Sequence, residues 1–338
     1  MEVKNQWKGW LYLAPALILL AVFTFYPFFK TIFIAFMGSY TGEMVKTMDG
    51  ALVPELVGYD PLKTQGVDWT FNNFYYGRYL EVFGDNGYEW KWTVTGVFGS
   101  KDFNQALLNT AVIAVVTVPG STIIALLMSV ALNSIKPLQK FLQTIYFLPY
   151  VTNSIAIGMV FAVMFDMSTQ GVRYDGLINN FLSIFGIPAR GWVELDASWG
   201  AKMTVACVYG IWYAFPFKIM ILLGALQSVN KQYYDAAKVD CASRFRTFWK
   251  ITVPMLSPMI SYVLITGFIG AFKEYSSLIG LFGDDLALYK MNTIVGLVYE
   301  SLETNNYGLA SSYAIALFGI ILLFTLVNLY VSNKKVHY

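Results

Sequence analysis

Charged residues are scarce in this chain. Asp, Glu, Lys and Arg make up 13% of its 338 residues, whereas they form roughly a quarter of an ordinary soluble domain. Hydrophobic residues reach 57%, and the mean hydropathy is +0.53. This composition excludes a typical soluble domain and indicates an integral membrane protein. The formal net charge of +2 gives no support for nucleic-acid binding.

Histidine and cysteine are nearly absent as well. His337 is the sole histidine, which excludes most histidine-based metal and catalytic sites. The two cysteines, Cys207 and Cys241, lie in an apolar run and in a basic loop, so we expect no disulfide between them. The sequence also has no G-x-x-x-x-G-K-[ST] phosphate loop, H-E-x-x-H, C-x-x-C or nucleophile elbow. We therefore expect no enzyme activity, cofactor or metal in this chain, and an energy supply from a partner or an ion gradient.

Long apolar runs dominate what is present. Six of them are long enough to cross a membrane: residues 10–36, 105–132, 141–165, 199–226, 258–282 and 309–331. The first run is too long for a signal-peptide core, so it is predicted to be an uncleaved span within residues 1–37. We predict an all-α membrane protein with its helical core in residues 105–332 and a short basic tail at 333–338.

Residues 38–104 differ from the rest because they are polar, acidic and rich in aromatics. The stretches YLEVF and YEWKWTV flank Gly84-Asp85-Asn86-Gly87, which predicts a β-hairpin. We expect a small extracytoplasmic subdomain here. Its aromatics could rest on the membrane interface, or form part of a docking surface for a solute-binding protein.

Orientation follows from counting Lys and Arg in the short connections. The segments proposed as cytoplasmic hold eleven, against three in the two short outer loops, Arg173, Arg190 and Lys290. The positive-inside rule then predicts that both termini and residues 228–258 are cytoplasmic.

Residues 228–258 form the one long charged segment between two apolar runs. Ser228 and Asn230 are candidate N-caps for a helix over residues 231–239. A second helix is predicted over 244–251, stopped by the prolines at 254 and 258.

Within this segment, DAAKVDCASRFRTFWKITVP resembles the cytoplasmic EAA loop of ABC importer permeases. The family pattern is Glu-Ala-Ala, then Asp-Gly-Ala, an aromatic residue and Ile-x-x-Pro. The resemblance implies ATPase coupling through Asp235, Ala236, Ala237, Asp240, Cys241, Ala242, Phe248 and Pro254, with Ile251 also in register. Asp235 replaces the usual Glu and keeps its charge, whereas Cys241 replaces the usual Gly of the turn. A loop that packs only on its own bundle is the alternative.

From about residue 104 onward the chain resembles the carbohydrate-uptake branch of these permeases, which includes the maltose-type transporters. The stretches that carry the resemblance are ALLNTAVIAVV, FLPYVTNSIAIGMVFAVMF, GLINNFL, GIWYAFPFKIMILLGALQSV and YGLASSYAIALFGIILL. Two stretches depart from the pattern. LFGDDLALYK stands where Thr-x-Gly-Gly-Pro is usual, and residues 38–104 are longer than usual.

This resemblance implies a type I ABC importer permease fold with six transmembrane helices, in the inner or plasma membrane of a prokaryote. The chain looks like the first member of a heterodimeric permease pair. The implied partners are a second permease subunit, two ATP-binding subunits that hold ATP and Mg, an extracytoplasmic solute-binding protein, membrane lipid and a saccharide, in particular an oligosaccharide.

Polar side chains at membrane depth are costly and call for an explanation. Lys218 lies inside the fourth run, and Lys273 and Glu274 are expected well inside a helix spanning 258–282, where adjacent side chains diverge and seek different partners. The spans that line the path in the family suggest Asn153, Trp212, Lys273, Glu274 and Tyr275 as substrate-path residues. Tyr150, Ser154, Tyr209 and Tyr213 are further candidates. These groups suit a carbohydrate better than a bare ion, although helix packing would also account for the aromatics.

The function predicted from the sequence is that of a permease subunit in an ATP-driven saccharide importer. An ion-gradient-driven secondary transporter with Glu274 as the coupling site is the alternative. A membrane scaffold or receptor that moves no substrate is a third possibility.

Overall fold

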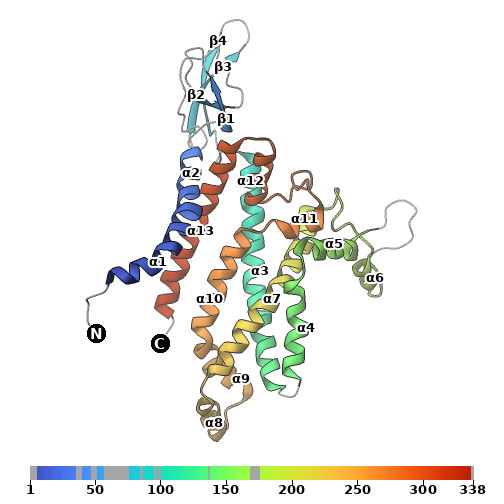
Figure 1. Cartoon of the computed structure of the whole chain (residues 1–338). Helices are drawn as coiled ribbons and strands as arrows, with labels where there is room; N and C mark the ends of the chain where they lie inside the picture. Colours follow the sequence, from blue (N-terminus) through green and yellow to red (C-terminus); the bar gives the residue numbers. More distant parts are fainter. Residues whose placement is uncertain are drawn as a thin grey trace. The chain divides into compact units, whose positions relative to one another are not determined.

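The computed structural model describes residues 6–35, 40–46, 52–56, 76–83, 87–94, 97, 100–135, 138–167 and 176–335 (Figure 1). The chain divides into two compact units. One consists of residues 1–104 and 297–319, and the other of residues 105–296 and 320–338. Arg173, the turn of the predicted hairpin at 84–86 and the last three residues lie outside the described parts.

The first unit begins with α1 (Gln6–Leu20), a π-helical turn η2 (Ala21–Phe25) and α2 (Tyr26–Ala35). Together they form an apolar helix, of which α2 contacts the first half of α13 (Tyr307–Lys335). The Ser312 hydroxyl donates to the carbonyl of Ala35 over 2.9 Å, and the rings of Phe28 and Phe318 meet edge to face with their centroids 5.3 Å apart.

Two antiparallel strand pairs follow α2. β1 (Tyr40–Lys46) pairs with β2 (Leu52–Leu56), and β3 (Tyr76–Phe83) pairs with β4 (Gly87–Val94). Phe83 stands opposite Gly87, so the β-hairpin predicted from YLEVF and YEWKWTV is confirmed. The pairing of β1 with β2 was not predicted. That this segment lies outside the membrane stays a prediction.

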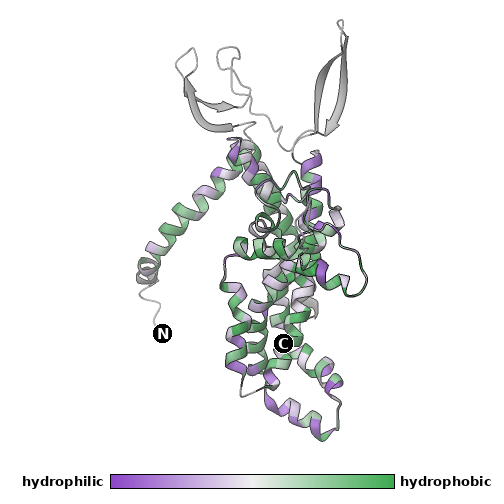
Figure 2. Cartoon of the chain, turned by 90° about the vertical axis from the view of Figure 1, so that its right-hand side faces the viewer, coloured by the Kyte–Doolittle hydropathy of each residue, from purple (hydrophilic) through white to green (hydrophobic). Residues whose placement is uncertain are grey.

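The remaining helices carry the core. Their bounds are α3 (Lys101–Ser134), α4 (Gln139–Val151), α5 (Ser154–Phe165), α6 (Leu177–Ser183), α7 (Trp199–Ser228), α8 (Lys231–Val239), α9 (Arg244–Thr247), the π-helical turn η5 (Phe248–Thr252), α10 (Val253–Phe272), α11 (Ser276–Phe282) and α12 (Ile294–Glu303). Figure 2 shows apolar colours along the long helices. Within the described residues five helices are long and apolar enough to span a membrane, and the bent pair of α4 and α5 makes a sixth if it counts as one span. The predicted helical, six-span architecture is confirmed in this form.

Two of the six predicted spans are broken rather than straight. α4 and α5 meet at an angle of 93°. Pro149 lies in the last turn of α4, and the Asn153 side chain caps α5 by accepting from the amide of Ile155 over 2.9 Å. The fifth span ends its first helix at Phe272 and restarts at Ser276. The expectation of one continuous helix over 258–282 was therefore wrong.

The fifth span also begins earlier than expected. The predicted stop of the second cytoplasmic helix was wrong, because α9, η5 and α10 follow one another without a break. Pro254 comes just after the π-helical turn η5, and local π-helical adjustments of this kind let a membrane helix continue through a proline. A single helical rod thus runs from Arg244 to Phe272.

Two groups of buried apolar side chains hold the second unit together. One joins α5, α7 and α11 around Phe161, Tyr209 and Leu278. The other joins α3, α7 and α10 around Ala125, Leu222 and Val263, with α4 packed against it. Since α7 belongs to both groups, it is the central helix of this unit.

Candidate functional site

The charged segment after α7 folds as a helix, a tight turn and a second helix. The predicted first helix is confirmed as α8, and Asn230 caps it by accepting from the amide of Gln232 over 3.0 Å. Ser228 is not a cap, because it ends α7 and its hydroxyl donates to the carbonyl of Ala225. On the exposed face of α8, Lys238 donates to Asp235 over 2.9 Å. This hydrogen bond is the main reason that the pKa of the Asp235 carboxyl lies below its ordinary value.

The turn between α8 and α9 is a Schellman motif. The amide of Ala242 donates to the carbonyl of Ala237, and the amide of Cys241 to that of Lys238. Cys241 has φ 52°, the left-handed conformation that favours glycine. The backbone thus takes the shape expected of the usual Asp-Gly-Ala turn although the glycine is replaced. Ser243 then caps α9 through the amide of Arg246.

A groove lies along this segment. It is lined by Tyr233, Ala236, Ala237, Asp240, Ala242, Arg246, Thr247, Lys250 and Ile251. Of the eight predicted coupling residues, four line this groove, and Asp235 and Cys241 are exposed beside it. Phe248 and Pro254 are not part of its lining. The basic side chains Arg246 and Lys250 were not singled out by sequence, because they belong to no motif position.

A second concavity lies in the interior of the unit. It measures about 280 Å³ and is bounded by residues of α3, α4, α7, α10 and α11, with Glu274. Its aromatic lining consists of Tyr150, Tyr209, Tyr213 and Phe217, and its charged lining of Lys218 and Glu274. The remaining wall is apolar or hydroxyl-bearing, which is the usual make-up of a small-molecule site.

The aromatic side chains form one continuous wall. Phe217 stacks on Tyr150 with ring centroids 4.9 Å apart. Tyr150 lies 6.1 Å from Tyr213, which in turn stacks on Tyr209 at 5.9 Å. The Tyr209 hydroxyl donates to the carbonyl of Ser154 over 2.7 Å, at the break between α4 and α5. Tyr209 therefore ties the central helix to the bent span.

Glu274 lies in the break between α10 and α11. Its Oε1 accepts from the amides of Tyr275 and Ser277 and from the Ser277 hydroxyl, the last over 2.7 Å. Its backbone carbonyl accepts from the Thr293 hydroxyl. The carboxylate thus replaces the hydrogen bonds that the broken helix lacks, while its Oε2 accepts none from the part of the chain that the structure describes.

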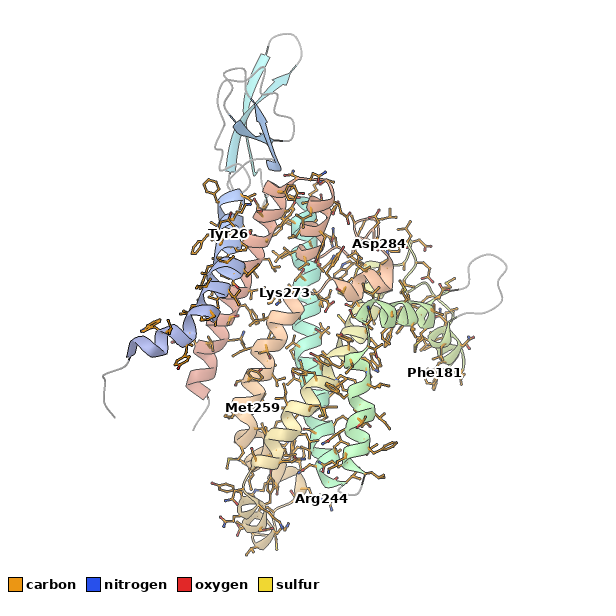
Figure 3. The ribbon with its side chains drawn as sticks, viewed as in Figure 1. Tyr26, Phe181, Arg244, Met259, Lys273 and Asp284 are labelled. Atoms are coloured by element: carbon orange, nitrogen blue, oxygen red, sulfur yellow. The ribbon has the colours of Figure 1, made fainter. Side chains whose placement is uncertain are left out.

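The other predicted path residues do not reach the cavity. Asn153 is exposed and caps α5, while Trp212 packs on Phe161 at a centroid distance of 5.2 Å. Lys273 is exposed at the end of α10, where Figure 3 labels it, and Tyr275 is half-buried beside Gly296. Of the five, only Glu274 lines the cavity, so the path assigned to the other four stays a prediction.

Lys218 is buried, with 5% of its surface exposed. Its ammonium group donates to the Val118 carbonyl at 3.1 Å, the Ser121 hydroxyl at 2.7 Å and the Thr122 hydroxyl at 3.0 Å. A lysine ammonium has three N–H donors, so all of them are used on α3. The sequence places this charged residue inside an apolar run, where a charge is costly. In the structure, its hydrogen bonds link α7 to α3.

A bundle of apolar helices around a cavity with two charged lining residues, and a charged helix–turn–helix between two spans, defines a multi-spanning membrane permease component. Comparison with known proteins names the family. Residues 121–336 match the binding-protein-dependent transport system inner membrane component family. This match covers well over half of the chain, which therefore belongs to that family.

Individual relatives cover most of the chain. The lactose transport system permease protein LacF of Rhizobium radiobacter is 27% identical over 329 residues, covering 94% of this chain and 92% of LacF. The arabinooligosaccharides transport system permease protein AraP of Halalkalibacterium halodurans is 30% identical over 240 residues, covering 68% and 71%. A crystal structure of a bacterial alginate ABC transporter, in complex with a periplasmic protein bound to an alginate pentasaccharide, contains a chain of the same fold. Its TM-score is 0.70 at 21% identity, with 98% of this chain and 96% of that chain covered.

Proposed function

We propose that this chain is a transmembrane permease subunit of an ATP-driven importer that receives a saccharide from an extracytoplasmic solute-binding protein. It works with a second permease subunit and two ATP-binding subunits, which hold ATP and Mg, in an inner or plasma membrane with both termini in the cytoplasm. The observation that carries the proposal is the helix–turn–helix over 231–252 with its groove, in a chain of the binding-protein-dependent family.

The helix–turn–helix is placed so that its movement would be transmitted to the membrane helices on either side of it. α8 follows α7 after two residues, and α9 continues through η5 into α10. Because α7 and α10 both line the central cavity, a displacement of the helix–turn–helix would move two of its walls together. An ATPase that closes on ATP and holds the groove could thus reshape the cavity, which is the requirement of alternating access.

A saccharide fits the cavity better than an ion. Sugar rings stack on aromatic faces, and their hydroxyls need hydrogen-bond partners. The cavity offers the tyrosine wall together with a carboxylate oxygen. The relatives are transport proteins for lactose, arabinooligosaccharides and trehalose or maltose, and the structural neighbour imports the acidic polysaccharide alginate. The position of Glu274 within the apolar fifth span is explained by its hydrogen bonds to the start of α11. No observation therefore favours the ion-coupled alternative.

The groove gives the test. Ala236 is exposed and lines it, whereas Val239 is exposed on the same helix and does not. We expect Ala236→Arg to insert into the membrane normally but to lose the co-purifying ATPase and ATP-driven sugar uptake, because a bulky cation would fill the groove. Val239→Arg adds the same side chain beside the groove and should retain both. Retention of the ATPase by Ala236→Arg would contradict the proposal.

A further inference from the structure

The two charged groups of the central cavity are not equally available to a ligand. The Lys218 ammonium is buried, and its three donors are directed at α3. The exposed Lys273 beside Glu274 is not part of the lining. The described lining therefore offers a ligand no free cation.

Only one of the two oxygens of the Glu274 carboxylate accepts hydrogen bonds from the described residues. The carboxylate accepts three hydrogen bonds from the described residues, and all three go to Oε1. Oε2 accepts no hydrogen bond from the described residues. A fully buried oxygen without a partner would be an unsatisfied buried atom, but among the described residues only Gln139 Nε2 is such an atom. Oε2 is therefore accessible. The cavity thus combines an accessible anionic acceptor with a wall of tyrosines in one lining.

The tyrosine wall supplies ring faces and hydroxyl groups that a sugar can contact. The Tyr209 hydroxyl is used on the Ser154 carbonyl. Tyr150 and Tyr213 contribute ring faces, and no hydrogen bond of either hydroxyl occurs within the described residues. A phenol hydroxyl can donate or accept, so the cavity combines two adaptable groups with one strong acceptor.

We propose that this cavity selects uncharged saccharides and rejects uronates, and that Glu274 sets this selectivity. The inference rests on the proposed function and names its substrate class. A sugar hydroxyl can donate to Oε2 and form a charge-assisted hydrogen bond. A uronate carboxylate at the same place would face a like charge, and the described lining has no free cation to offset it, so its binding is disfavoured.

The test uses the assembled importer in lipid nanodiscs and sugars that differ only at C6. Saturation-transfer difference NMR would compare galactose with galacturonate and glucose with glucuronate. We expect the neutral member of each pair to bind about tenfold or more tightly than its uronate, since the uronate carboxylate and the Glu274 carboxylate repel each other. Glu274→Gln keeps Oε1 as the acceptor for α11 but removes the charge, so it should reduce the preference by about tenfold.

Asp284→Asn serves as the matched control, because Asp284 is an exposed carboxylate outside the cavity lining and is labelled in Figure 3. It should keep the wild-type preference. Equal binding of both members of a pair, binding of neither, or an unchanged preference in Glu274→Gln would each overturn the inference. Co-purification of the ATPase with the same preparation shows whether the proposed function still holds when the inference fails.

Discussion

Gly158 of α5 and Gly280 of α11 meet backbone to backbone. A Cβ atom on Gly158 would lie 2.8 Å from the Cα of Gly280, and one on Gly280 would lie 2.5 Å from the carbonyl oxygen of Ile155. Each glycine belongs to the second half of a broken span, so the two short helices pack through bare backbone. Small residues at helix contacts in membranes allow this approach.

The first prediction concerns this contact. Gly280→Ala should separate α5 from α11 and destabilise the protein by about 1–3 kcal/mol, the usual cost of overpacking. The measurement is the thermal unfolding midpoint in detergent. Gly224→Ala in α7 is the control, because its Cβ would meet nothing within 4 Å and alanine favours a helix by about 0.8–1.0 kcal/mol over glycine. A Gly280→Ala variant as stable as the wild type would show that the contact is loose.

The second prediction concerns the Lys218 bridge. Ser121→Ala together with Thr122→Val removes two of its three acceptors and leaves a buried cation under-satisfied, at a cost of about 2–4 kcal/mol. Adding Lys218→Met removes the cation while filling its space, so the triple variant should recover at least half of the loss. Unfolding midpoints of the variants form a mutant cycle. Simple additivity of the changes would refute the bridge.

The third prediction follows from the backbone of Cys241. A non-glycine residue in the left-handed region costs about 1–2 kcal/mol. Cys241→Gly should therefore raise the unfolding midpoint, offset in part by the greater freedom of glycine in the unfolded chain. Cys241→Val should lower the midpoint, because a β-branched side chain suits this conformation poorly. The opposite order of the two variants would contradict the assigned turn.

The fourth prediction uses the two native cysteines to test orientation. Cys241 is exposed and Cys207 is buried, so a membrane-impermeant maleimide should modify Cys241 alone. Labelling should occur in inside-out vesicles and be absent in intact cells, because the proposed ATPase contact is cytoplasmic. Cys241→Ser is the control for residual reaction at Cys207. Labelling in intact cells would reverse the topology and remove the basis of the proposed function.

The sequence by itself determined the parts of this protein that depend on local chemistry. Apolar runs predict spans because hydrocarbon excludes unpaired backbone groups. The helix over 231–239 followed from Asn230 and the lack of breakers, and one hairpin followed from strand residues around a Gly-Asp-Asn-Gly turn. Glu274 was predicted as a functional residue because a carboxylate inside an apolar span is energetically costly.

Only the tertiary structure decided where the spans break and what the polar groups do there. The breaks at 152–153 and 273–275 are supported by packing of Gly158 on Gly280, residues more than a hundred positions apart. Lys218 likewise finds its partners on α3, far away in sequence. Periodicity and propensity describe neighbours along the chain, whereas these features depend on contacts between distant helices.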